Sequence, residues 1–181
     1  MNLDSPRKDL NNEFGKSEQM ALNAENCPWP QDFVRFYEFN LAKYVRIANL
    51  IVQSRQVSED IVQDAFIRVA NKWSKIENHE AFLRKAVVNS CNSYFRRRKL
   101  ERLYSARYHN PGEITNDDRN ELGELLLRLS IKQRVAVTLR FYEDLSDKEI
   151  AEVIGCNPNS IPSLISRALN KLNGEISKDG N

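Results

Sequence analysis

The segment LSDKEIAEVIGCNPNSIPSLISRALNKL, residues 145–172, restricts the fold of this chain more than any other stretch. Ser146 and Glu149 have the spacing of a capping box, in which each side chain bonds a free backbone N–H of the other residue. Gly155 stands where a first helix would end in the left-handed conformation. The segment therefore predicts a helix-turn-helix. Its second helix would bury the apolar residues Ile161, Leu164, Ile165, Ala168, Leu169 and Leu172.

The chain upstream of this segment also has helical periodicity. From Asp32 to about Gln53, apolar residues recur at intervals of three and four, which predicts an amphipathic helix. Ser58, followed by two acidic residues, predicts the N-cap of a second helix. A third helix is expected to begin near Asn78. The buried faces are expected to comprise Ile61, Val62, Ala65, Phe66, Val69 and Trp73 in the second helix, and Phe82, Leu83, Ala86, Val87, Cys91 and Tyr94 in the third.

Residues 105–117 contain Pro111 and Gly112, little apolar content and no period, which predicts a linker. A second helical unit is expected from Asp118, with Ser130 as the N-cap of one of its helices. Its first apolar face would comprise Leu122, Leu125, Leu126 and Leu129.

The predicted fold class is all-α, with two small helical domains joined by a flexible linker. The expected organisation is a disordered N-terminal tail (1–30), a first domain (31–104), the linker (105–117), a second domain (118–175) and a C-terminal tail (176–181). Trp29 is expected to pack back on the first domain, and an anchor for a binding partner is the alternative.

The composition excludes several classes of protein. With 41% hydrophobic and 29% charged residues, the chain is neither collagen-like nor wholly disordered. No apolar run is long enough for a membrane span or a leader, so we expect a cytoplasmic protein without membrane contact. Cys27, Cys91 and Cys156 are widely spaced, which predicts neither a disulfide framework nor a metal site. Cys91 and Cys156 are expected to be small buried hydrophobes.

An enzyme is not expected either. The chain has only two histidines, no glycine-rich phosphate loop and no clustered carboxylates beside a base. We therefore predict neither a catalytic residue nor a cofactor.

Positive charge is concentrated in the first half of the chain. Residues 31–104 carry 14 Lys or Arg and 8 Asp or Glu, whereas residues 117–175 carry 8 and 10. The stretch NSCNSYFRRRKLER, residues 89–102, places two aromatic residues directly before a basic run. A solvated helix end would use some of these cations to stabilise the helix dipole. Aromatic groups beside the charges favour nucleic acid, because phosphates need cations and exposed bases need flat surfaces for stacking.

Several segments in order carry a family resemblance. SEDIVQDAFIRV, AFLRKAVVNSCNSYFRRRKLER and LLLRLSIKQRVAVTLRFYEDLSDKEIAEVIG resemble the extracytoplasmic-function (ECF) group of the sigma-70 superfamily, over residues 31–173. The likeness is closest to the sigma-E-like subgroup common in actinobacteria. It implies a dissociable subunit that binds core RNA polymerase, recognises promoter DNA and initiates transcription of a specific regulon, with sigma region 2 in the first domain and sigma region 4 in the second.

The resemblance also implies residue roles. The residues matching the helix that docks on the clamp of core polymerase are Asp60, Gln63, Asp64 and Arg68. Those matching the segments that contact and melt the minus-ten element are Lys72, Lys75, Asn78, Asn89, Ser93, Tyr94, Phe95, Arg96, Arg97, Arg98, Lys99 and Arg102. Those matching the helix-turn-helix contacts to the minus-thirty-five element are Ser146, Asn159, Ser160, Ser163, Ser166, Arg167, Asn170 and Lys171. Further partners implied are promoter DNA and an anti-sigma factor, and the free protein would be a monomer.

The phrase NSIPSL departs from the family pattern, which usually reads like GTVKSR. Pro162 replaces the lysine and Leu164 the arginine. Proline is tolerated in the first turn of a helix and costly further in, so we expect the second helix to start after Ser160. Minus-thirty-five contact is then expected to be weaker or differently specified.

Two other classes stay open at this point. A helix-turn-helix regulator that binds an operator as a homodimer would need a dimerisation helix or a ligand pocket, and neither has an obvious candidate. A sigma-like interaction module with weakened minus-thirty-five binding would fit the acidic balance of residues 117–175.

Overall fold

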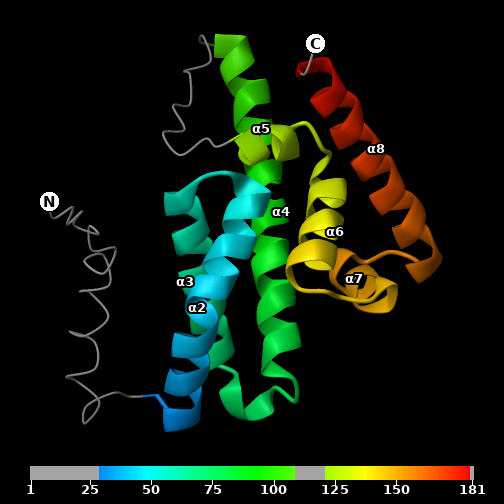
Figure 1. Cartoon of the computed structure of the whole chain (residues 1–181). Coiled ribbons are helices and arrows are strands. Elements are labelled where there is room, and N and C mark those ends of the chain that lie inside the picture. The colour runs from blue at the N-terminus through cyan, green and yellow to red at the C-terminus, as the bar shows by residue number, and fades with distance from the viewer. Residues whose placement is uncertain (1–28, 109–120, 180–181) are drawn as a thin grey trace, which may run out of the picture.

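The computed structural model describes residues 29–108 and 121–179, and the elements it assigns there are helices (Figure 1). The first bundle consists of α2 (Gln31–Val52), α3 (Arg55–Ala70), the 3₁₀ turn η2 (Trp73–Lys75) and α4 (His79–Tyr108). The second bundle consists of α5 (Glu121–Leu127), α6 (Ile131–Tyr142), α7 (Asp147–Ile154), the 3₁₀ turn η3 (Pro158–Ser160) and α8 (Ile161–Asp179). The all-α fold predicted from the sequence is confirmed. Cys27, most of the predicted N-terminal tail and residues 109–117 of the predicted linker lie outside the described residues.

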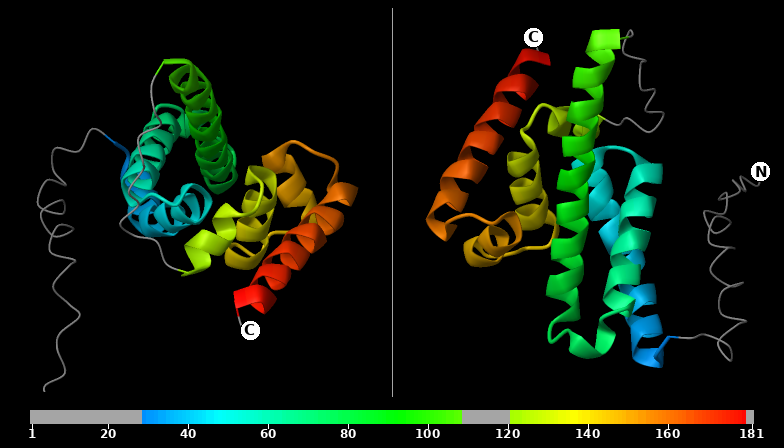
Figure 2. Two further views of the ribbon diagram at one scale, coloured as in Figure 1. Left: turned by 90° about the horizontal axis from the view of Figure 1, so that it is seen from above. Right: turned by 180° about the vertical axis from the view of Figure 1, so that it is seen from behind.

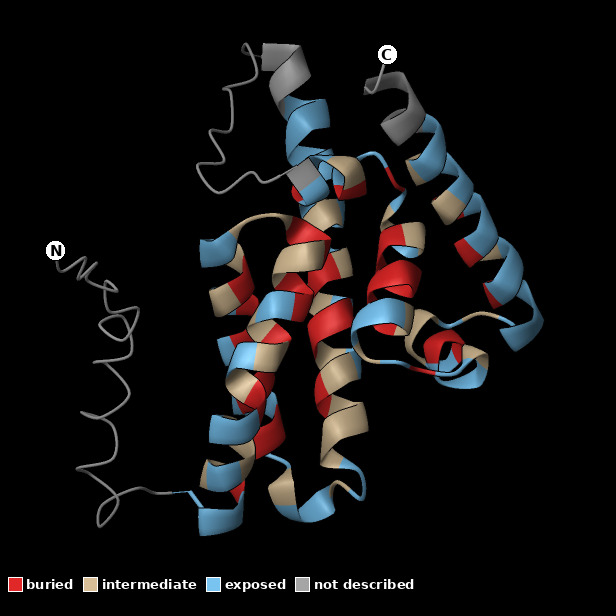
Figure 3. Ribbon diagram, in the orientation of Figure 1, coloured by how far each residue is buried: buried red, intermediate tan, exposed pale blue. Residues whose placement is uncertain are grey.

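The first bundle follows from the apolar stripes of its three long helices. α2 covers the predicted helix with its bounds shifted by one residue, and α4 begins one residue after Asn78. The side chains buried between the helices include Tyr44, Ile47, Ile51, Val62, Ala65, Phe66, Leu83, Val87 and Cys91. Figure 3 shows that the buried parts of these helices, in red, lie where the helices face one another.

The predicted start of the second helix is wrong. α3 begins at Arg55, and Ser58 is buried inside it, where its hydroxyl donates to the Ser54 carbonyl over 2.6 Å. Gln53 ends α2 in the left-handed conformation, with φ 56°, and Ser54 is extended. Gln53 and Ser54 make the whole connection between α2 and α3. α3 therefore starts earlier than the acidic residues Glu59 and Asp60 indicate.

The connection between α3 and α4 contains an aromatic cluster. Trp73 lies in η2 and is half-buried, so the prediction that it extends the buried face of the second helix is wrong. Its ring stacks on His79 at 3.7 Å between centroids, and the His79 Nε2 donates to the Trp73 carbonyl over 2.9 Å. Trp29 packs on Phe33 at 5.6 Å, which confirms that it folds back on the first bundle.

The helix-turn-helix is confirmed. Ser146 and Glu149 form the predicted capping box of α7, and Gly155 ends that helix with φ 74°. α8 begins at Ile161, so Pro162 occupies the first turn as expected. Ser130 caps α6 in a second capping box with Gln133. Of the predicted second-helix positions, Ile161, Ile165 and Ala168 are buried and Leu164, Leu169 and Leu172 are half-buried.

Three boundary or burial predictions are corrected. α4 continues to Tyr108, into the predicted linker, because strong helix formers occupy its last turns and no proline occurs before Pro111. α8 continues to Asp179, into the predicted C-terminal tail, because extending a formed helix is easier than starting one. Leu122 is 54% exposed, because the short α5 buries Leu126 instead.

The two bundles share one hydrophobic core. α6 packs along α2, α7 packs on α4, and the views in Figure 2 show the bundles side by side. The second bundle adds eight buried residues to the cluster formed by α2, α3 and α4: Val135, Ala136, Leu139, Leu145, Ile150, Ala151, Ile161 and Ile165. The sequence predicted two units and a linker, but it did not indicate that the units would pack together.

Candidate nucleic-acid interface

A groove between α3 and α4 brings two predicted sets of residues together. It has a volume of about 400 Å³. Asp60, Asp64 and Arg68 line it from α3, and Gln63 is exposed nearby on the same helix. Asn89, Ser93, Tyr94, Arg97 and Arg98 line it from α4. The groups predicted to dock on polymerase therefore lie directly beside those predicted to contact DNA.

The cations of the basic run differ in their exposure to solvent. The exposed ones are Arg96, Arg97, Lys99 and Arg102. Arg98 is half-buried, donates to the Tyr94 hydroxyl over 2.9 Å and lies 5.5 Å from the centre of that ring. Arg98 thus holds Tyr94 in place, whereas its neighbours project into solvent where a phosphate can reach them.

The two aromatic residues before the basic run are half-buried. Tyr94 and Phe95 pack edge to face at 5.4 Å between centroids, and both border the shared core. The Arg134 guanidinium, from α6, lies 5.5 Å from the centre of the Phe95 ring. In this conformation, Phe95 does not offer both of its faces for stacking on a base.

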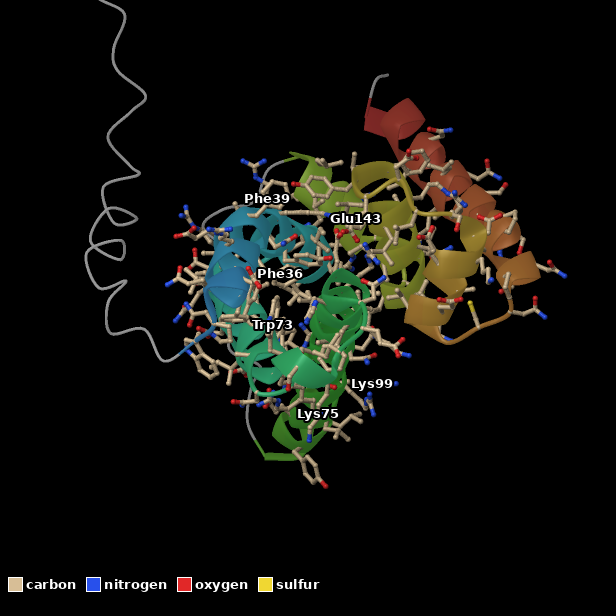
Figure 4. The ribbon with its side chains drawn as sticks, turned by 90° about the horizontal axis from the view of Figure 1, so that it is seen from below. Phe36, Phe39, Trp73, Lys75, Lys99 and Glu143 are labelled. Carbon is tan, nitrogen blue, oxygen red and sulfur yellow. The ribbon has the colours of Figure 1, made fainter. Side chains whose placement is uncertain are left out.

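The segment from Lys72 to Asn78 connects α3 to α4 at the lower end of the first bundle in Figure 1. Lys72 and Lys75 are exposed, and Lys72 lies 5.9 Å from the ring centre of Phe82. Trp73, within this segment, lies beside Phe36 in Figure 4, and their ring centroids are 5.4 Å apart. The Asn78 side chain accepts the Ala81 N–H over 2.9 Å, so it caps α4. Asn78 therefore has a structural role in addition to its predicted contact with DNA.

The predicted contact residues of the helix-turn-helix are all exposed. They are Ser146, Asn159, Ser160, Ser163, Ser166, Arg167, Asn170 and Lys171. Several of them also bond within their own helices. The Ser146 hydroxyl is used by the capping box, and the Arg167 Nε donates to the Ser163 carbonyl over 3.1 Å. Arg167 retains its terminal NH₂ groups for a phosphate or a base.

Sequence reasoning missed a buried charged cluster between the bundles. The Glu143 side chain has no exposed surface, and its Oε2 lies 2.6 Å from Arg84 Nε. Its Oε1 lies 2.9 Å from Lys43 Nζ, a charge contact without the alignment of a hydrogen bond. Lys43 also bonds Glu80 over 2.6 Å. Figure 4 shows Glu143 directed toward the first bundle.

Burial and ion pairing have opposite effects on the pKa values of the two cations in this cluster, Lys43 and Arg84. Burial alone lowers the pKa of Lys43 and of Arg84. The bonds and charges of Glu143 and Glu80 outweigh it, so both pKa values are raised. Burial also raises the pKa of Tyr44, whose hydroxyl donates to the Glu80 carbonyl over 3.3 Å. Lys43 and Arg84 therefore keep their positive charges at neutral pH.

Arg134 is a second buried cation that the sequence did not indicate. It is 3% exposed and lies opposite backbone carbonyls instead of a carboxylate. It donates to the carbonyls of Leu126, Leu127 and Leu129, at the end of α5, and to that of Ile51 in α2. Burial lowers the pKa of Arg134. No sequence signal separates this residue from the exposed Lys132 on the same helix.

Within the described residues, the two cysteines, Cys91 and Cys156, are free thiols. Cys91 is fully buried, and burial raises its pKa to about 12, so its thiol is unreactive. Cys156 is only half-buried, which corrects the expectation that it is a core residue.

Residues 29–108 and 121–179 contain no cluster of His, Cys, Asp and Glu that could hold a metal ion, and none of their helices has the length and apolarity to cross a membrane.

A basic, aromatic helix next to a helix-turn-helix defines a DNA-binding protein of two helical modules, and comparisons with known proteins give its family. Residues 36–101 match the family model of sigma-70 region 2, and residues 119–172 match that of sigma-70 region 4. The chain is 30% identical to the RNA polymerase sigma-E factor of Streptomyces coelicolor over 139 residues, which covers 73% of this chain and 78% of that protein. It is 25% identical to the RNA polymerase sigma factor SigV of Bacillus subtilis over 142 residues, covering 75% and 86%.

Solved structures give the same result. The sigma factor RpoE from Bartonella quintana, in complex with the anti-sigma factor NepR, matches with a TM-score of 0.69 and 26% identity over 84% of this chain and 100% of that one. CnrH in complex with the cytosolic domain of CnrY, at 20% identity, has the same fold, with a TM-score of 0.64 over 88% of this chain and 96% of that one. The chain belongs to the ECF group of sigma-70 RNA polymerase sigma factors. It initiates transcription and is not an enzyme.

Proposed function

We propose that the exposed face of α3 docks on the clamp of core RNA polymerase while the neighbouring face of α4 contacts the minus-ten element. The observation that carries this proposal is the groove between the two helices, with Asp60 and Asp64 on one wall and Arg97 on the other. Acidic and amide groups on α3 suit a basic partner surface, and cations on α4 suit DNA phosphates. One rigid bundle thereby holds the promoter at a fixed place on the polymerase.

The segment from Lys72 to Asn78 is proposed to receive a base of the minus-ten element after it leaves the duplex. Removing a base from the stack costs a few kcal/mol, so a surface that accepts it favours melting. The stacked pair Trp73 and His79 supports this role, because it fixes the backbone of the turn. Lys72 and Lys75 are exposed on either side of it, where they can bind phosphates.

The helix-turn-helix is proposed to contact the minus-thirty-five element weakly. Pro162 and Leu164 supply no cation, and only Arg167 and Lys171 carry positive charge between residues 157 and 173. A sigma factor whose second bundle acts mainly as an interaction module remains the alternative, and the acidic balance of residues 117–175 favours it.

We also propose an anti-sigma protein as a partner, in the cytoplasm. RpoE of Bartonella quintana, which shares the fold and 26% of its residues with this chain, was solved with an anti-sigma factor. A protein that co-purifies stoichiometrically with this chain, and abolishes transcription when it is added back, would establish such a partner.

The experiment that tests the proposed function is run-off transcription with bacterial core polymerase on a pool of genomic promoter fragments, with sequencing of the transcript starts. We expect starts that depend on this protein and share one upstream pattern. The paired change Asp60→Asn and Asp64→Asn should lower the affinity for core polymerase, whereas Glu38→Gln, at an exposed position on α2, should not. Equal polymerase affinity for both variants would refute the docking face.

A further inference from the structure

The turn from Lys72 to Asn78, called here the base-accepting turn, has few attachments to the rest of the protein. None of its side chains is buried, and only Trp73 and Ile76 are half-buried. The 3₁₀ turn within it has no side-chain cap, and the bond from the Ile76 N–H to the Trp73 carbonyl is long, at 3.4 Å. The conformation of the base-accepting turn therefore depends on what holds the Trp73 ring.

The Trp73 ring belongs to a row of aromatic contacts that starts at Trp29. Trp29 packs on Phe33 with 5.6 Å between ring centroids, and Phe33 packs edge to face on Trp73 at 5.3 Å. Phe33 is buried, and Trp29 is one of the rings that cover it. Aromatic pairs of this kind are favourable beyond the area that they bury. The row therefore connects the residue just before α2 to the base-accepting turn.

The sequence around Trp29 favours a fixed position for its ring. Trp29 stands between Pro28 and Pro30 in the phrase CPWPQD. A residue before proline is restricted to extended conformations, so Trp29 loses little conformational entropy when it packs on Phe33. α2 has no side-chain cap at Pro30, so this contact also fixes how the helix begins, much as a hydrophobic staple does. Trp29 and Phe33 both precede residues 36–101, which match sigma-70 region 2.

We propose that Trp29 is a positioning residue for capture of the promoter base: through Phe33 and Trp73 it holds the base-accepting turn in place. The inference rests on the proposed role of that turn. A turn that is already ordered loses less entropy when a base binds to it, so the contact raises the affinity for the unpaired strand. Docking of α3 on polymerase and phosphate contact by α4 do not involve Trp29.

The test compares single-stranded DNA with and without the captured base. Holoenzyme is reconstituted from core polymerase and the full chain. The probe is a labelled non-template oligonucleotide that carries the minus-ten element of a promoter found by run-off transcription. Abasic substitution at each position identifies the base whose loss weakens binding to the unaltered protein most. We expect Trp29→Ala to weaken binding of the intact oligonucleotide about twofold to tenfold, the contribution of one aromatic pair, and to leave binding of that abasic oligonucleotide unchanged.

Two other variants serve as comparisons. Trp29→Phe keeps an aromatic ring against Phe33 and should restore most of the affinity for the intact oligonucleotide. Phe39→Ala removes a ring that is 85% exposed on the same helix and that Figure 4 shows away from Trp73, so it should leave the affinity unchanged. A Trp29→Ala loss of equal size for the intact and the abasic oligonucleotide, or no loss at all, would overturn the inference. The proposed role of the base-accepting turn would still stand on the response of the unaltered protein to the abasic position.

Hydrogen exchange of the free full chain tests the positioning step without DNA. The amides of Lys75 and Ile76 donate within the base-accepting turn, so their exchange reports its order. We expect Trp29→Ala to accelerate exchange there about twofold to tenfold and to leave α7 as it was. Unchanged exchange in the turn would show that Trp29 does not hold it, and the inference would fail.

Two controls separate the remaining outcomes. Circular dichroism verifies that Trp29→Ala is folded, and if it is not, Trp29→Leu, which keeps more apolar surface, replaces it. If no abasic position weakens binding of the unaltered protein, the base-accepting role and the inference are both refuted. If one position does so and Trp29→Ala affects only the oligonucleotide with that base intact, both are supported.

Discussion

The Arg84 Nε on α4 lies 2.6 Å from the Oε2 of Glu143, which follows α6, so an ion pair connects residues 59 positions apart in the chain. The Arg84 side chain is only 12% exposed, and that of Glu143 has no exposed surface. Surface ion pairs contribute little to stability, but a buried pair is costly to break, because the remaining charge stays without a partner. The contact therefore makes the packing of the two bundles dependent on single side chains.

Glu143→Gln should reduce the free energy of unfolding by about 3 kcal/mol, as expected when one member of a buried pair is removed. Urea denaturation followed by circular dichroism measures this change. The matched control is Glu59→Gln, which breaks the exposed pair with Arg55 at 3.0 Å and should cost less than about 1 kcal/mol. Equal losses in the two variants would show that the buried pair contributes no more than the surface pair does.

Arg134→Met should also lower the free energy of unfolding, by about 3 kcal/mol. The methionine retains the apolar stem but removes the Arg134 donor from the buried carbonyls of Ile51 and Leu129, at about 1 to 3 kcal/mol each before relaxation. Lys132→Met, at an exposed position on the same helix, should change stability by less than about 0.5 kcal/mol. Thermal unfolding of the two variants provides the comparison, and a stable Arg134→Met chain would contradict it.

The double change Arg96→Ala and Arg97→Ala should flatten the salt dependence of promoter binding by the holoenzyme. Each phosphate that the protein no longer neutralises reduces the slope of log K against log salt by roughly 0.7 to 0.9. Arg98→Ala should alter the slope less, because Arg98 already bonds Tyr94. Fluorescence anisotropy over a series of salt concentrations measures both slopes. If the double change left the slope as it was, the basic run would serve only to stabilise the end of α4.

Ser146→Ala should raise the pKa of Glu149. The Ser146 hydroxyl and backbone N–H bond the ionised Glu149 carboxylate at 2.6 and 2.9 Å, and these bonds lower its pKa below the ordinary value of 4.5. Since the folded pKa lies below the unfolded one, the stabilisation is present above pH 4.5 and is lost as the pH falls through the folded value. Carboxyl ¹³C NMR titration follows the shift, and an identical pKa in the variant would mean that the hydroxyl bond is absent in solution.

Arg167→Ala should weaken protection upstream of the minus-ten element in a footprint of the holoenzyme. Arg167 and Lys171 are the cations that α8 can offer to the minus-thirty-five element between residues 157 and 173. Lys148→Ala, at an exposed position on α7, is the comparison variant. Strong upstream protection that does not respond to Arg167→Ala would refute the weak and cation-dependent contact proposed for α8.

Much of the secondary structure was predictable, because local interactions specify it. The capping boxes at Ser130 and Ser146, the left-handed Gly155 and the first-turn position of Pro162 depend on residues within one helical turn of each other. The apolar stripes of α2, α4 and α8 follow from the period of the helix. Where prediction failed, as at Ser58, a neighbouring turn residue decided the boundary.

The sequence by itself determined the helices, the helix-turn-helix and the basic run beside Tyr94 and Phe95. Only the tertiary structure decided how the two bundles meet. A glutamate such as Glu143 and an arginine such as Arg134 resemble ordinary surface residues in a sequence, because their burial depends on partners far along the chain. Those partners, Lys43, Ile51 and Arg84, become neighbours only when the core forms. The packing of the two bundles on each other thus depends on long-range contacts, which no local pattern encodes.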